Sequence, residues 1–205
     1  MLRFRTGIWI AIVLTLARAA PANAASRALA VTVLGGSEDS RIAAVEEAVE
    51  FWNARLEEIG ANVRFGPVRV VEESISDGLL RRMSRQVVDG PGTSLPDRID
   101  EIPGDVVVAL SDADLASFGI ARTRWNKGFV AIRRGDVPPL SLPNVARNAI
   151  AHELGHVLGL SHNEDRSTLM CGRPAPCRPD AFASESDRFF PLTAPEESEL
   201  RERWR

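Results

Sequence analysis

The residues of this chain that are equipped for chemistry gather in residues 151–163, which read AHELGHVLGLSHN and contain all three histidines of the protein. His152 and His156 are four residues apart on a predicted helix. Their side chains therefore project from one face, with Cβ atoms about 5 to 6 Å apart, and two imidazoles at that spacing can share one zinc ion. Gly159 can adopt a positive φ and end the helix, which lets the chain turn back and deliver His162 as a third ligand.

Glu153 directly follows the first predicted ligand, and this position gives it a different role. Its carboxylate can reach a zinc-bound water without binding the metal itself. Zinc lowers the pKa of such a water to about 7 and polarises the scissile carbonyl. The sequence therefore predicts Glu153 as the general base, which takes the proton from water and passes it to the leaving amine.

Histidines on a helix can also be ordinary surface or core residues, and the HExxH spacing alone does not decide between the two interpretations. The longer spacing, in which Gly159 and His162 follow the histidine pair, is far more specific and predicts both zinc binding and catalysis. Because all three histidines belong to this segment, none is left for a Ser–His or Cys–His pair elsewhere.

Residues 152–162, HELGHVLGLSH, resemble the metzincin signature HExxHxxGxxH at every defining position. Metzincins also carry a methionine turn, and residues 167–170, STLM, resemble it. The resemblance implies that Met170 packs beneath the histidines as an apolar floor and not as a ligand, the alternative being an ordinary core methionine. Within the metzincins, the sequences of this helix and of this turn are most similar to those of the matrixins.

Two features depart from the matrixin pattern. Asn163 follows the third histidine, at the position whose residue distinguishes the metzincin subfamilies, and it is atypical there. The chain also has no further histidines for the structural zinc of a matrixin. We therefore expect one zinc ion per chain, and the subfamily stays open.

The resemblance also implies where substrate would bind. Phe129, Val130, Ala131 and Ile132 would form the edge strand above the cleft and add the substrate backbone as a further strand. Residues 171–190 would wall the primed-side specificity pocket, whose preferred side chain the sequence does not reveal.

Two further pairs of residues have possible roles outside the histidine segment. Cys171 and Cys177 lie close together in a Pro-rich stretch, and we expect a short disulfide, with two reduced thiols as the alternative. Asp112 and Asp114 offer carboxylates to calcium, but a turn at the end of a strand explains them more simply, so calcium is possible and not indicated.

The elements expected to position these residues form one α+β domain of the zincin or metzincin type, residues 25–205. It comprises a twisted mixed sheet, a long backing helix, the active-site helix and a C-terminal helix. A capping box of Thr193 and Glu196 begins the last helix. The pattern predicts strands at 29–34, 63–71, 106–110 and 129–132, and helices at 41–59, 77–88, 143–158 and 193–204.

Residues 1–24 have the pattern of a secretory signal peptide. Arg3 and Arg5 precede an apolar run at 7–17, and small residues stand at 22–24. The apolar run is shorter than the roughly 20 residues of a spanning helix, so we expect cleavage after Ala24 in preference to a membrane anchor. The mature protein would be secreted or periplasmic, with no membrane attachment. A formal net charge of −3 gives no sign of nucleic-acid binding.

The function predicted from these residues is that of an exported zinc endopeptidase acting on proteins or peptides. Two alternatives stay open. A binding module could hold zinc without turnover, although an intact Glu153 argues against it. A zinc amidase could act on a non-protein substrate, because the same activated water attacks any amide. The sequence does not reveal the natural substrate or the oligomeric state.

Overall fold

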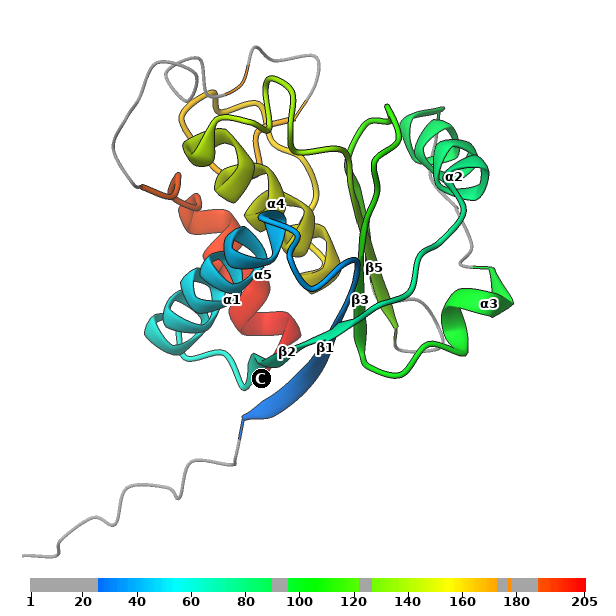
Figure 1. Ribbon diagram of the computed structural model, residues 1–205. Helices are drawn as coiled ribbons and strands as arrows, with labels where there is room; N and C mark the ends of the chain where they lie inside the picture. The colour runs from blue at the N-terminus through cyan, green and yellow to red at the C-terminus, as the bar shows by residue number, and fades with distance from the viewer. Residues whose placement is uncertain (1–25, 90–95, 122–126, 173–176, 178–187) are drawn as a thin grey trace, which may run out of the picture.

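The computed structural model describes residues 26–89, 96–121, 127–172, 177 and 188–205 (Figure 1). The predicted signal peptide and most of the predicted pocket wall at 171–190 lie outside the described residues. Within the described ranges, no helix is both long enough and apolar enough to cross a membrane.

Five strands form one mixed sheet in the order β2-β1-β3-β5-β4. The first four strands in that order run parallel, and β4 is antiparallel to β5. All four strands predicted from the sequence are present, and Gly66-Pro67 within β2 falls at a shift in the register between β1 and β2. The strands are β1 (Arg27–Leu34), β2 (Val63–Val71), β3 (Val106–Leu110), β4 (Phe118–Ile120) and β5 (Gly128–Ile132).

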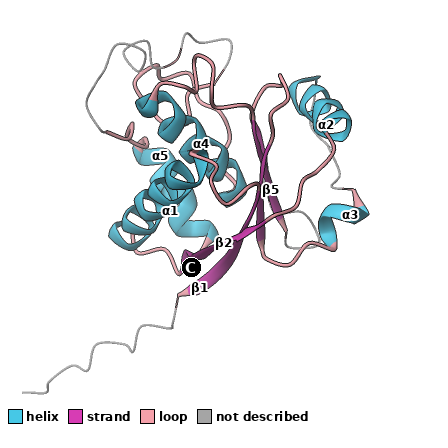
Figure 2. Ribbon diagram, in the orientation of Figure 1, coloured by secondary structure: helices cyan, strands magenta, loops and turns pink. Residues whose placement is uncertain are grey.

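Helices cover both faces of this sheet (Figure 2). On one face pack α1 (Arg41–Glu58), α4 (Pro143–Leu158) and α5 (Ala194–Arg203), and on the other lie α2 (Asp77–Asp89) and α3 (Asp97–Asp100). This explains why every residue of β3, VVVAL, is buried, since a strand covered on both faces has no polar side. The second buried face goes beyond the prediction, which had a helix at 77–88 but none at α3.

Trp52 joins the long helix α1 to α4. Its side chain is fully buried, and its indole nitrogen donates a hydrogen bond to the backbone carbonyl of Ala151 over 2.8 Å. Ala151 immediately precedes His152 on α4. The predicted backing helix is therefore attached to the histidine-bearing helix at the residue next to the first predicted ligand.

The prediction that residues 129–132 form an edge strand is wrong. They belong to β5, which pairs with β3 on one side and with β4 on the other. The edge of the sheet on this side is β4, a strand of three residues that folds back antiparallel onto β5. Its short length explains why it was missed, because periodicity is not measurable over three residues.

Candidate metal centre

Helix α4 presents two of the three histidines. Pro143 lies in its first turn, and Gly159 ends it with the predicted positive φ, here +102°. The backbone N–H groups of Gly159 and Leu160 donate to the carbonyls of His156 and Gly155 over 2.9 and 3.0 Å. These bonds close the helix and reverse the chain toward His162.

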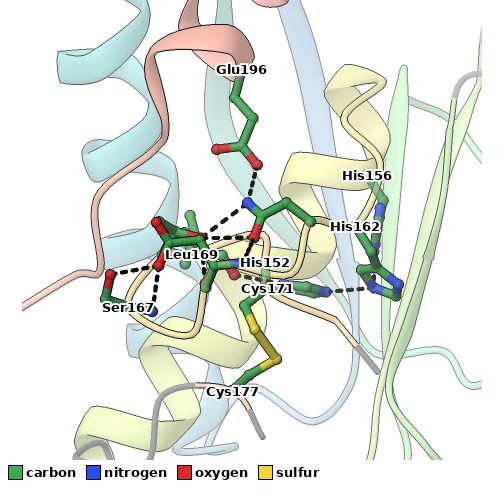
Figure 3. Close-up of a disulfide and its surroundings, with 11 residues drawn as sticks. His152, His156, His162, Ser167, Leu169, Cys171, Cys177 and Glu196 are labelled. Carbon is green, nitrogen blue, oxygen red and sulfur yellow. Dashed lines mark hydrogen bonds between the residues drawn. A yellow bond between two sulfur atoms is a disulfide. The ribbon is translucent and has the colours of Figure 1, made fainter. Parts of the chain in front are cut away.

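The three histidine rings converge at one point (Figure 3). Nε2 of His162 lies 3.1 Å from Nε2 of His152 and 3.0 Å from Nε2 of His156. Two nitrogens bound to one tetrahedral zinc at 2.0 to 2.1 Å would be roughly 3.3 Å apart. The residues that the sequence nominated as ligands are therefore brought together at a spacing that suits a small metal ion.

The protonation of two rings is determined by their other nitrogen. Nδ1 of His152 lies 2.7 Å from the carbonyl oxygen of Leu169, and Nδ1 of His156 lies 2.8 Å from that of Leu160. A carbonyl oxygen can only accept, so each Nδ1 carries the proton and each neutral ring directs a lone pair from Nε2. The single Nε2 of His162 cannot donate a proton to both lone pairs. A bound cation resolves this conflict, so the donor set fits a metal ion.

The surroundings of His156 keep its imidazole neutral. The pKa of His156 is lowered from 6.5 to about 4, chiefly by burial; the bond to the Leu160 carbonyl opposes this shift, and neighbouring His162 adds to it. At neutral pH the ring therefore keeps the lone pair that a metal requires.

Glu153 and strand β4 lie next to these rings. Glu153 follows His152 on α4 and is 8% exposed. A Cβ built on Gly119, the middle residue of β4, would lie 2.3 Å from the backbone oxygen of Glu153 and 3.0 Å from Cβ of His156. Only glycine permits this approach. Strand β4 thus runs directly beside the turn of α4 that carries Glu153 and two histidines.

Met170 is fully buried beneath the same helix. A Cβ built on Gly155 would lie 2.5 Å from its sulfur and 3.1 Å from the Trp52 ring. Gly155 stands between the two helical histidines in sequence, so the thioether packs against the backbone that spaces them. The absence of a side chain at Gly155 makes this contact possible.

The structure joins Cys171 and Cys177 in the disulfide that the sequence predicts. Cys171 is buried and directly follows Met170. Asp112 and Asp114, by contrast, do not join the histidine site. Their carboxylates lie 3.3 and 2.8 Å from the guanidinium groups of Arg41 and Arg133, as charged groups that follow a strand end.

Sequence reasoning missed three contributors to the site. Strand β4 was too short to detect, and no sequence pattern pointed to Gly172, against whose backbone the His162 ring packs. The third is Asn163, which was noted only as an atypical residue. Its side chain bonds to Glu196, which the sequence had identified as the capping partner of Thr193 but not as a neighbour of the histidines.

No family model matches the chain, and no curated protein matches it in sequence. Among solved structures, it is similar to an archaemetzincin from Methanopyrus kandleri, with 19% identity over 90% of this chain and 98% of that chain and a TM-score of 0.49. It is also similar to a zinc-dependent peptidase from Methanocorpusculum labreanum, with 14% identity over 83% of this chain and 99% of that chain and a TM-score of 0.39. A chaperone–substrate complex is similar at 19% identity and a TM-score of 0.44, over 73% of this chain and 29% of that one.

Proposed function

We propose that the protein is a zinc-dependent endopeptidase with a metzincin-type site and one zinc ion per chain. The observation that carries this proposal is the convergence of three histidine nitrogens, two of which have their lone pair directed inward by a carbonyl bonded to Nδ1. His152, His156 and His162 would hold the ion. When bound, zinc lowers the pKa of a water molecule and polarises the carbonyl that the water attacks.

Glu153 is the proton carrier in this proposal. Its place next to His152 and its burial support the role, because a carboxylate shielded from bulk water exchanges protons with a nearby reactant rather than with solvent. It takes a proton from the attacking water and returns it to the leaving amine. No covalent enzyme intermediate is needed.

Met170 forms the apolar floor of the site in this proposal, as in a Met-turn. Its full burial and its contact with Gly155 support the role. The Leu169 carbonyl, from the residue before it, orients His152.

The outer edge of β4, and not β5, is where an extended substrate would add as a further strand. The support is its terminal place in the sheet together with the close approach of Gly119 to α4. Because a peptide lying along an edge strand extends past both sides of the scissile bond, this geometry favours cleavage within a chain.

We further propose that the protein acts outside the cytoplasm, in a periplasm or in the extracellular medium. The disulfide between Cys171 and Cys177 supports this location, because such bonds persist in oxidising compartments.

The experiment that tests this function is digestion of a peptide library by the parent and by Glu153→Ala, each with and without a chelator. Glu153→Ala should retain zinc and lose about 10² to 10⁴ in rate. The matched control is Glu164→Ala, which alters an exposed carboxylate beyond the third histidine and should stay active.

Three results would contradict the proposal in different ways. Equal rates for Glu153→Ala and the parent would remove the base assignment. A parent that holds zinc but cuts no peptide would favour a binding module, or an amidase if non-peptide amides are cleaved. A parent without zinc would reject the metal site.

A further inference from the structure

His162 is supported less directly than the two helical histidines. It is exposed and lies outside every helix and strand, four residues after α4 ends. Its position therefore depends on the residues that hold the chain on either side of it. On one side Leu160 is buried and its carbonyl bonds to His156. On the other side stands Asn163.

The backbone of Asn163 is tied to the segment around Met170. Its N–H donates to the Met170 carbonyl over 2.9 Å, and its carbonyl accepts from the N–H of Gly172 over 3.0 Å. Asn163 thereby forms an isolated parallel bridge with Cys171. These two bonds hold the chain next to His162 against the chain next to the disulfide.

The side chain of Asn163 extends this attachment to α5. Its Nδ2 donates to Oε1 of Glu196 over 2.6 Å and to the Thr168 hydroxyl over 3.0 Å. Its Oδ1 accepts from the N–H of Asp165 over 2.8 Å. The amide therefore uses its donor and its acceptor at once, which no apolar residue can reproduce.

Glu196 is itself fixed in place. It is 7% exposed, and its second oxygen, Oε2, accepts from the N–H of Thr193 over 2.7 Å within the capping box. A buried carboxylate needs such donors, and a bond to it is stronger than one between neutral groups. In Figure 3, the side chain of Glu196 extends from α5 toward the segment that follows His162.

Gly172 leaves the space that the third histidine occupies. A Cβ built on Gly172 would lie 2.1 Å from Cγ and 2.5 Å from Nδ1 of His162. The imidazole therefore lies against the backbone of Gly172, which Asn163 holds through its carbonyl. Movement of Asn163 would displace both the chain that carries the ring and the surface on which the ring rests.

We propose that Asn163 and Glu196 form a positioning pair, through which α5 holds the third predicted ligand, His162, in place. The pair touches neither metal nor substrate, and it acts by fixing the backbone on which His162 is placed. This inference rests on the proposed zinc site. It makes the atypical residue after the third histidine the link between the metal centre and α5.

The test measures the zinc dissociation constant by competition with a chromophoric chelator, together with the visible absorption spectrum of the cobalt(II)-substituted protein. Asn163→Ala should weaken zinc binding about 10-fold, as changes outside the ligand set do, and should alter the cobalt spectrum. The double exchange Asn163→Asp with Glu196→Gln swaps donor and acceptor. The zinc affinity of this double variant should stay within about threefold of that of the parent, in contrast to the loss in Asn163→Ala.

Two controls separate positioning from general stability. Thr193→Ala removes the hydroxyl of the same capping box but keeps the backbone N–H that holds Glu196. It should lower the thermal midpoint of the metal-free protein and leave zinc affinity and the cobalt spectrum unchanged. His162→Ala gives the loss expected when the ligand itself is absent.

Zinc binding by Asn163→Ala equal to that of the parent, or an equal loss in Thr193→Ala, would overturn the positioning role while leaving the zinc site intact. Failure of the double exchange to restore binding would do the same. A parent that binds no zinc would overturn both this inference and the proposed function. If Asn163→Ala does not fold, Glu196→Gln replaces it, with an expected loss of about 10-fold, because glutamine has a single carbonyl oxygen and cannot accept from both Asn163 and Thr193.

Discussion

Helix α4 and the segment that follows it, residues 160–172, hold the three histidines by different means. In α4, the helical repeat alone places His152 and His156 on one face, and burial of the helix against α1 keeps it there. In the following segment no regular element carries His162. Its place depends on the hydrogen bonds that the next residue, Asn163, makes with Met170, Gly172 and Glu196. The proposed metal site thus combines two ligands placed by local helix geometry with one placed by long-range contacts.

The packing of α4 against α1 can be disrupted at Trp52. Trp52→Ala should lower the free energy of unfolding by about 3 to 5 kcal/mol, because it empties a fully buried site between α1 and α4. Trp52→Phe keeps most of the volume and loses the bond to Ala151 together with part of the ring, so about 1 to 3 kcal/mol is expected. Denaturant unfolding measures both, and a cost below about 1 kcal/mol for Trp52→Ala would show that α4 is not held there.

The segment after α4 can be weakened at its disulfide. Replacement of Cys171 and Cys177 by serine should cost about 2 kcal/mol of unfolding free energy, the loop entropy for a sequence separation of 6. Oxidised parent, reduced parent and the double variant should be compared in denaturant. Identical unfolding midpoints for all three would show that the bridge does not stabilise this segment.

A more gradual effect, spread over a range of pH, concerns His156. The pKa of His156 is about 4 in the folded protein against the usual 6.5, so between these values the unfolded chain binds more protons. The metal-free protein should therefore lose stability as pH falls from 6.5 toward 4, by up to about 1.4 kcal/mol per pH unit from this group, with no further loss from it below that range. His156→Asn should show a shallower slope, and equal slopes in parent and variant would contradict the assignment.

The same division explains how much could be predicted from the sequence. The spacing of His152 and His156, the bounds of α4 and the turn at Gly159 follow from local rules, and the structure agrees with them. The bond between Asn163 and Glu196 joins residues 33 positions apart, and no local pattern records it. Likewise Gly172 matters only because His162 folds back against it.

The error in the edge strand has a physical cause that the sequence did contain. Residues 129–132, FVAI, are continuously apolar, as expected of an interior strand. The opposite edge, β2, carries Arg64, Pro67 and Arg69, which are typical of strands that must not pair with another chain. The family resemblance placed residues 129–132 at the edge of the sheet, whereas this contrast in composition correctly indicates an interior strand.

In the proposed site, two helical histidines and one histidine after the helix jointly hold one metal ion. The most direct measurement is the zinc content of the parent, His152→Ala, His156→Ala and His162→Ala after dialysis against equal, limiting free zinc. We predict one zinc per chain in the parent and a sharp loss in each of the three variants. Full zinc occupancy in all three variants, or an absence of zinc from the parent, would contradict the account.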